Sequence, residues 1–181
     1  EVVRIVMHQT WASRANTNQA QINYNFWTSE TRAAHKADPN SKYGVSAHFT
    51  VEGDGRVIQH VDTKDGSMST GAFNTGAVHI EFAAQDDPLR PQQLHAGAEL
   101  MAWIQKEHPK VKLVPVGTSN KKPGDNKQEG ITGHSFVEIV GKKLGILMKK
   151  KNEPKENCPG QLIINQMNTI AVLASVRRTL M

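Results

Sequence analysis

Cysteine is nearly absent from this chain of 181 residues, in which Cys158 is the only one. A single cysteine cannot form an internal disulfide, so the fold does not depend on an oxidising compartment. Long apolar runs are also missing: no stretch approaches the roughly 18 residues that span a bilayer, so we expect no membrane insertion. Aromatic residues make up only 6% of the chain, with no stacking motif, and we expect no nucleic-acid partner.

The opening EVVRIVMHQT lacks the basic leader and the length of apolar run that mark a signal peptide. No targeting segment is visible, and a piece cut from a longer chain would look the same. The length suits one domain with its own core, so we treat residues 1–181 as a single domain. The net charge of +5 favours a polyanion such as an acidic cell-wall polymer, but a basic domain without such a partner fits equally well.

Hydrophobic periodicity predicts strands that alternate with helices. Strands are expected at residues 2–8, in a hairpin over 44–62, at 77–84 and at 111–116, and helices at 16–37, from about Pro91, and over QLIINQMNTIAVLASVRRTL at the end. The last of these has an apolar stripe of Ile163, Met167, Ile170 and Ala174. This order predicts an α/β domain with a mixed central sheet flanked by helices.

One segment has no clear place in this order. Residues 136–157 form an apolar and basic piece, FVEIVGKKLGILMKKK, that runs into NEPKEN. Its lysines could bind a polyanion, although a run of charge is more often a solvated face. We interpret 136–157 as an insertion that forms an extra wall near the site.

Three residues could form a metal site. His8 ends the first predicted strand, His134 follows Gly133, and Cys158 precedes Pro159. Two imidazoles and one thiolate are a normal zinc set, and three protein ligands leave a fourth position for water. No local zinc motif links the three, so from the residues alone an inert buried cysteine stays open.

Five short stretches follow one another along the chain in an order that is typical of one enzyme family: VRIVMHQT, VSAHFTVEGDGRVIQHV, NTGAVHIEF, GITGH and CPG. Together they resemble the zinc-dependent N-acetylmuramoyl-L-alanine amidases, the family of T7 lysozyme, AmpD and the peptidoglycan recognition proteins. NTGAVHIEF looks like a strand of the AmpD-type members, in which an Asn is followed by four residues and then by Gly-Ile-Glu-Leu. The resemblance covers residue 3 to about residue 162 and implies the amidase fold.

The resemblance also implies a ligand set and a reaction. His8, His134 and Cys158 would hold one Zn²⁺, and the reaction would be hydrolysis of the amide between N-acetylmuramic acid and L-alanine. Glu81 matches the AmpD-type carboxylate that acts as the base. T7 lysozyme-like members use a tyrosine before the HF histidine, where this chain has Ala47. Recognition proteins that do not cut peptidoglycan commonly lack the cysteine, so Cys158 favours an enzyme.

Other positions carry weaker expectations. Asn74 matches a family asparagine and is a candidate for substrate binding, although loop asparagines often only make turns. Lys155 and His79 are candidates for the oxyanion donor. Family members often carry a lysine two residues before the third ligand, where this chain has Glu156. By strand alternation we expect His48 to point away from the site and to be structural.

These expectations describe an amidase of bacterial cell walls, acting on peptidoglycan or muropeptide as a monomer. It would be a phage endolysin or a wall-remodelling enzyme. The rival hypothesis is a binding module of the same fold that recognises muropeptides without cutting them. A zinc hydrolase of some other amide is a more distant alternative.

Overall fold

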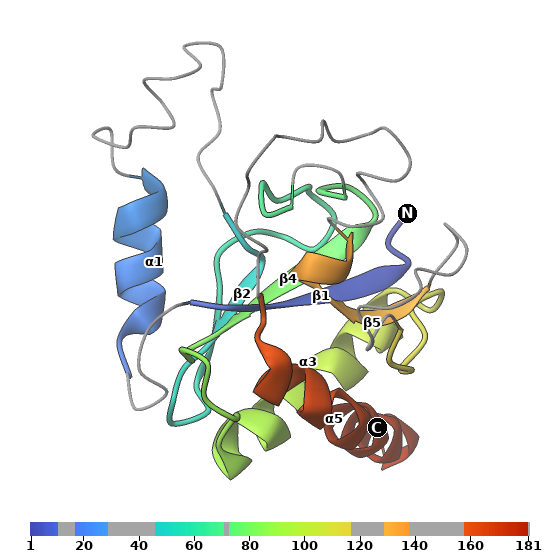
Figure 1. Cartoon of the computed structure of the whole chain (residues 1–181). Coiled ribbons are helices and arrows are strands. Elements are labelled where there is room, and N and C mark those ends of the chain that lie inside the picture. Colours follow the sequence, from blue (N-terminus) through green and yellow to red (C-terminus); the bar gives the residue numbers. More distant parts are fainter. Residues whose placement is uncertain (11–16, 29–45, 71–72, 117–128, 138–157, 181) are drawn as a thin grey trace.

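The computed structural model describes residues 1–10, 17–28, 46–70, 73–116, 129–137 and 158–180. They form one sheet and three long helices (Figure 1). The strands are β1 (Arg4–Gln9), β2 (Phe49–Val51), β3 (Val57–Gln59), β4 (Ala77–Phe82) and β5 (Gly130–Gly133). The helices are α1 (Gln19–Thr28), α3 (Pro91–Glu107) and α5 (Gln161–Leu180).

The sheet is mixed, as the sequence predicts, and its strand order is β3-β2-β4-β1-β5. β1 lies between β4 and β5 and is parallel to both. β2 runs parallel to β4, and only the hairpin partner β3 is antiparallel. The turn between β2 and β3 needs Gly55, whose φ of +90° lies in the left-handed region that favours glycine.

One face of the sheet is apolar and is covered by α3 and α5. Because side chains alternate along a strand, every second residue of each strand points to this face. The buried core joins strand residues to both helices: Ile5, Met7, Phe49, Val51, Val78, Ile80, Phe82 and Ile131 with Ala98, Met101, Ile104, Ile163, Met167, Ile170 and Ala174. The predicted stripe of the last helix is therefore confirmed, and Pro91 stands in the first turn of α3.

The opposite face of the sheet is polar, and α1 lies against its β2 side. Asn23 Nδ2 of α1 donates to Thr50 Oγ1 of β2 at 3.1 Å. Gln19, Ala20 and Asn23 of α1 are buried, whereas Ile22 is 46% exposed. The contact that α1 makes with β2 through Asn23 is therefore polar. The rest of that predicted helix, beyond Thr28, lies outside the described residues.

The strand expected at residues 111–116 does not form. Only an isolated parallel bridge joins Pro115 to Ile131. Val116 donates its N–H to Ile131, and Ile131 donates to Val114. Both bonds come from the neighbours of Pro115, so the proline nitrogen faces away from β5, where an edge position tolerates a missing N–H. The segment therefore touches the edge of the sheet through this one bridge.

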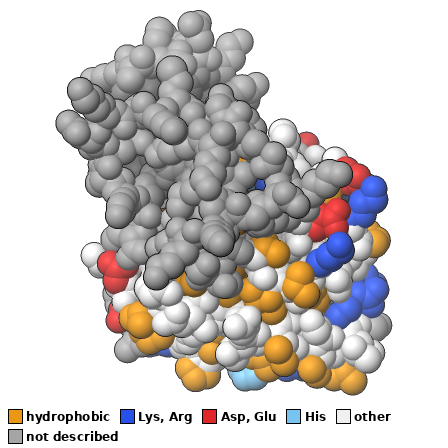
Figure 2. All heavy atoms as spheres, turned by 45° about the vertical axis from the view of Figure 1, so that its right-hand side comes forward, with side chains coloured by type: hydrophobic (Ala, Val, Ile, Leu, Met, Phe, Trp, Pro, Cys, Tyr) orange, Lys and Arg blue, Asp and Glu red, His pale blue; other side chains and the backbone are white. Residues whose placement is uncertain are grey.

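Charged side chains of the described surface are mixed in sign. On the face in Figure 2, Lys and Arg lie beside Asp and Glu, with hydrophobic side chains between them. Among the described residues, four pairs of opposite charge lie within salt-bridge distance: Arg56–Asp54 at 3.0 Å, Lys110–Glu1 at 2.8 Å, Lys112–Glu129 at 2.8 Å and Arg177–Glu99 at 3.3 Å. The described part of the chain contains no helix with the length and apolarity to cross a membrane.

Gly97 is where α3 comes closest to the core. A Cβ added there would lie 2.8 Å from Ile170 Cδ1 and 2.9 Å from Phe82 Cε1. We therefore predict that Gly97→Ala lowers the free energy of unfolding by about 1–2 kcal/mol. The expected overpacking cost of about 1–3 kcal/mol exceeds the gain of about 1 kcal/mol in helix propensity.

Denaturant unfolding measures this difference. His95→Ala on the exposed side of α3 is the matched control and should leave stability unchanged or slightly raised, since it changes helix propensity without adding a core atom. A Gly97→Ala protein as stable as the control would contradict the close packing of α3 on α5.

Candidate metal centre

Three potential metal ligands meet at one end of the polar face. His8 lies on β1, between β4 and β5, and His134 directly follows β5. Cys158 precedes α5. One ligand atom from each lies within 4.8 Å of the other two, and His8 and Cys158 are buried. The structure therefore brings together the three residues that the sequence singled out, although they are far apart along the chain.

Backbone contacts hold Cys158 against the two strands. Gln9 donates its backbone N–H to the Cys158 sulfur at 3.4 Å, and Ser135 donates its N–H to the Cys158 carbonyl at 2.8 Å. The sulfur lies 3.8 Å from His8 Nδ1. A backbone N–H aimed at sulfur favours the thiolate, which is the form that binds metals.

The turn after Cys158 is fixed by a paired contact between side chain and backbone. Gln9 donates through Nε2 to Asp86 Oδ1 at 3.2 Å, and the Asp86 N–H donates to Gln9 Oε1 at 3.0 Å. Gly160, with a φ of +86°, lies directly against both side chains. The strand residue next to His8 thus also positions the chain that carries Cys158.

Glu81 stands beside this cluster. It pairs with His8 in the parallel register of β1 and β4, and its Oε1 lies 4.0 Å from His8 Nδ1. Its side chain is 15% exposed. Its Oε2 is buried and has no hydrogen-bond partner among the described residues. Burial raises the pKa of Glu81 to about 8, so the site contains a carboxyl group whose second oxygen still lacks a partner.

Four histidines form a row across neighbouring strands. From β2 to β5 the order is His48, His79, His8 and His134, and successive ring centroids are 5.8, 5.3 and 4.9 Å apart. His48 was expected to point away from the site. Its ring instead stacks on His79, on the same face of the sheet, because β2 and β4 are parallel neighbours there. It is nevertheless fully buried and hydrogen-bonded, as a structural residue should be.

Burial keeps His8 of the cluster and the neighbouring His79 neutral. It lowers the pKa of His8 well below 6.5, and the neighbouring His134 and His79 lower it further. Burial is also the main reason that the pKa of His79 falls to about 3. Neutral imidazole is the form that offers a lone pair to a metal ion.

The remaining predicted site residues are placed differently. Asn74 accepts the backbone N–H groups of Ser69 and Thr70 through Oδ1, both at 2.9 Å, so it organises its own loop. Its contact with substrate stays a prediction. His79 is fully buried, with protein atoms at both ring nitrogens, which does not support a role as oxyanion donor. Lys155, with the rest of 138–157, lies outside the described residues.

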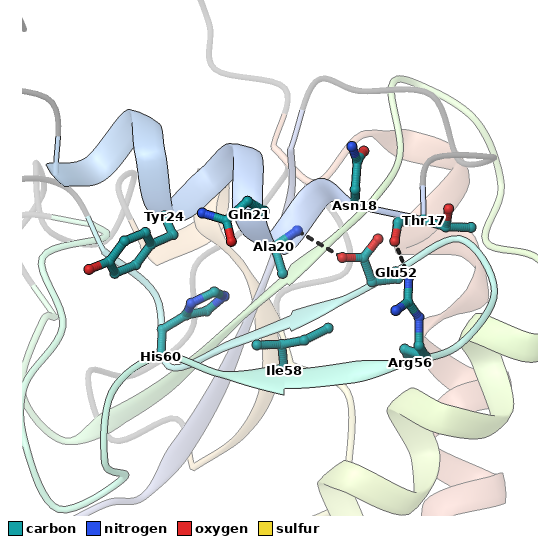
Figure 3. Close-up of a pocket in the computed structure, with 9 residues that line it drawn as sticks. All are labelled: Thr17, Asn18, Ala20, Gln21, Tyr24, Glu52, Arg56, Ile58 and His60. Atoms are coloured by element: carbon teal, nitrogen blue, oxygen red, sulfur yellow. Dashed lines mark hydrogen bonds between the residues drawn. The ribbon is translucent and has the colours of Figure 1, made fainter.

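A separate pocket of about 440 Å³ lies between α1 and the β2–β3 hairpin (Figure 3). Glu52 forms part of its floor and accepts the backbone N–H groups of Gln19 and Ala20, both at 2.9 Å. Arg56 closes one side by donating to the Thr17 carbonyl. The groups around this pocket therefore cap α1 and brace the hairpin, and none of the three candidate metal ligands lines it.

The sequence matches a family model described as N-acetylmuramoyl-L-alanine amidase over residues 1–161. No curated protein is significantly similar to it in sequence.

Several solved structures share the fold. The amidase LysC from Clostridium intestinale URNW aligns with a TM-score of 0.57 at 15% identity, over 93% of this chain and 83% of that one. Drosophila peptidoglycan recognition protein SD aligns with a TM-score of 0.60 at 15% identity, over 92% and 79%. The Ph2119 endolysin from a Thermus scotoductus MAT2119 bacteriophage aligns with a TM-score of 0.56 at 17% identity, over 94% and 84%.

The contact between Gly133 and Pro159 can be tested directly. A Cβ at Gly133 would lie 2.6 Å from Pro159 Cδ, next to Cys158. We predict that Gly133→Ala destabilises the protein by about 1–3 kcal/mol, because the rigid proline ring must move. Gly66→Ala, whose Cβ would come no closer than 3.3 Å to its neighbours, should cost less in the same thermal unfolding measurement. Equal effects would contradict the tight seat of the Cys158 segment.

Proposed function

Because the chain belongs to the N-acetylmuramoyl-L-alanine amidase family, we propose that it is a zinc-dependent enzyme that cleaves peptidoglycan. The bond cut would be the amide between N-acetylmuramic acid and the L-alanine of the stem peptide. One observation carries the proposal: a His-His-Cys cluster, in which His8 and Cys158 are buried, stands beside the largely buried carboxyl group of Glu81 at the end of three adjacent strands. Residues 1–181 would act as one catalytic domain.

The residues present fit a zinc ion. Two imidazole nitrogens and one sulfur are donors that zinc prefers, and three protein ligands are typical of catalytic rather than structural sites. The buried Glu81 Oε2, which has no partner among the described residues, is a further sign that this site takes another group. His8, His134 and Cys158 would hold the ion. When bound, zinc supplies a water that is activated as a nucleophile at neutral pH and a Lewis acid for the carbonyl.

Glu81 is the residue that would move the proton. It would take a proton from the attacking water and later give it to the leaving amine of L-alanine. Burial alone raises the pKa of Glu81 to about 8, and a dication nearby would lower that pKa again, since opposite charge favours the carboxylate. The base would then be charged at neutral pH when the site is loaded.

The remaining assignments complete this proposal. Lys155 would donate to the oxyanion, and residues 136–157 would form a wall of the substrate site. Peptidoglycan or muropeptide would be the partner, and the mode of delivery to the wall depends on the chain's origin as a phage or bacterial protein.

A binding module of the same fold is the second candidate. The similar structures include peptidoglycan recognition proteins as well as amidases, and one of them is a peptidoglycan recognition protein complex bound to tracheal cytotoxin. A binding module would retain peptidoglycan without releasing peptide from it. The zinc content and a cleavage assay separate the two functions.

Metal content tests the ligand set. We predict about one zinc per chain in the purified protein. Cys158→Ser should lower the zinc affinity by more than the roughly 10–100-fold effect of changing a residue that only orients a ligand, because a neutral hydroxyl replaces a thiolate. His60→Gln is the matched control, since His60 contacts Thr50 outside the cluster. Elemental analysis that finds no zinc in the wild type would move the assignment to the binding module.

Turnover tests the base. Glu81→Gln should keep its zinc and lose roughly 10²–10⁴-fold in the rate of peptide release from purified peptidoglycan, because the amide cannot accept the proton. Peptide release is followed by the new L-alanine amino termini. Wild-type turnover in a zinc-loaded Glu81→Gln protein would refute the role of Glu81, whereas binding without release by the wild type would favour the module.

A further inference from the structure

His79 connects the candidate ligand His8 to the backbone of a loop. Its Nδ1 lies 3.1 Å from His8 Nε2, and its Nε2 lies 3.1 Å from the carbonyl oxygen of Phe73. The residue is fully buried on β4, the strand next to β1. His8 is thus held on one side by His79, while its other ring nitrogen faces Cys158 and Glu81.

The chemistry of these partners fixes where each proton lies. A carbonyl oxygen can only accept, so His79 Nε2 must carry the hydrogen that points to Phe73. In a neutral imidazole the other nitrogen then accepts, so His8 Nε2 donates to His79 Nδ1. His8 Nδ1 is therefore left with its lone pair, and this is the nitrogen 3.8 Å from the Cys158 sulfur.

We propose that His79 is a positioning residue that holds His8 in the tautomer whose Nδ1 can bind a metal ion. This inference rests on the zinc site proposed above and deepens it. A histidine ligand binds well only when its other nitrogen is protonated and oriented, and the hydrogen-bond partner of that nitrogen sets both. The Phe73 carbonyl is the fixed acceptor that places a proton on His79 Nε2, and this in turn places the proton of His8 on its Nε2.

The orientation of His79 is itself determined by its neighbours. The ring stacks on His48 with an interplanar angle of 10°. The His79 backbone N–H donates to His48 Nδ1 at 3.0 Å, and His48 Nε2 lies 3.0 Å from the Asp65 carbonyl. His48 must therefore donate from Nε2, which leaves its Nδ1 free to accept from His79. Both imidazoles thus have one arrangement of protons that satisfies every contact.

Two substitutions separate this role from simple packing. His79→Leu fills much of the same space but cannot accept a hydrogen bond. His79→Asn places its Oδ1 near the position of Nδ1 and can still accept from His8. We expect His79→Leu to bind zinc roughly 10–100-fold more weakly than the wild type, and His79→Asn to recover most of that loss. Competition with a chromophoric chelator measures the affinities, and thermal unfolding of both variants reports packing.

If His79 served only to fill space, the zinc affinities of the two variants would rank differently. The apolar leucine would then be tolerated in the buried site at least as well as asparagine, and zinc affinity would follow the melting temperature. Equal zinc affinity in the leucine variant and the wild type would overturn the proposal while the zinc site itself stood.

Long-range ¹H–¹⁵N spectra of the imidazoles give a readout that does not depend on activity. In the zinc-loaded wild type we expect His8 to show a protonated Nε2 and a metal-bound Nδ1. A protonated Nδ1 on His8 would overturn the proposal. Absence of zinc from the wild type would instead overturn the proposed function, and spectra of that protein would still decide which nitrogen of His8 carries the proton.

Discussion

The position of β1 between β4 and β5 is the constraint on which the rest of this structure depends. Because β1 pairs in parallel with both β4 and β5, the carboxyl ends of these three strands lie side by side. His8 then faces Glu81 across one pairing and comes close to His134 across the other. Side chains alternate along each strand, so the neighbours of a residue that faces the site point to the opposite face and pack against the helices.

This division of faces explains how a polar site can be buried at modest cost. The apolar face and the two long helices supply the core. On the other face nearly every described buried polar group has a partner: His79 has two, His48 has two, and Thr50 contacts both Asn23 and His60. The exceptions among the described residues are Arg4 Nε, Thr10 Oγ1, Glu81 Oε2 and Thr132 Oγ1, and Glu81 belongs to the carboxyl group beside His8.

Much of the fold was predictable from the sequence, because strands such as 77–84 and helices such as α5 carry their period in their own residues. The helix-contact face of α1 was not, since it docks through Asn23 and Thr50 and polar docking leaves no apolar stripe. The segment at 111–116 looks like a strand by composition, but only Pro115 pairs with β5. Composition does not reveal how many residues of a segment reach the edge of a sheet.

The candidate ligands were visible as residue types that could form a zinc set, and the resemblance turned that possibility into an expectation. The contribution of His79 was hidden for a different reason. Its decisive partner is a backbone carbonyl, that of Phe73, and any residue type would supply one. The stacking of His48 on His79 depends likewise on which strands are neighbours, which single-strand alternation does not reveal.

The great separation of the three ligand residues has a consequence for how the protein is made. His8 and Cys158 are 150 positions apart, so a ribosome delivers Cys158 long after His8. A nascent chain that ends before Cys158 lacks a complete ligand set. Contacts this distant in sequence also form late, because closing a long loop carries an entropy cost before it brings any stabilisation. Competence to bind the ion would therefore arise only after Cys158 has been made and the β1 and β5 ends have met it.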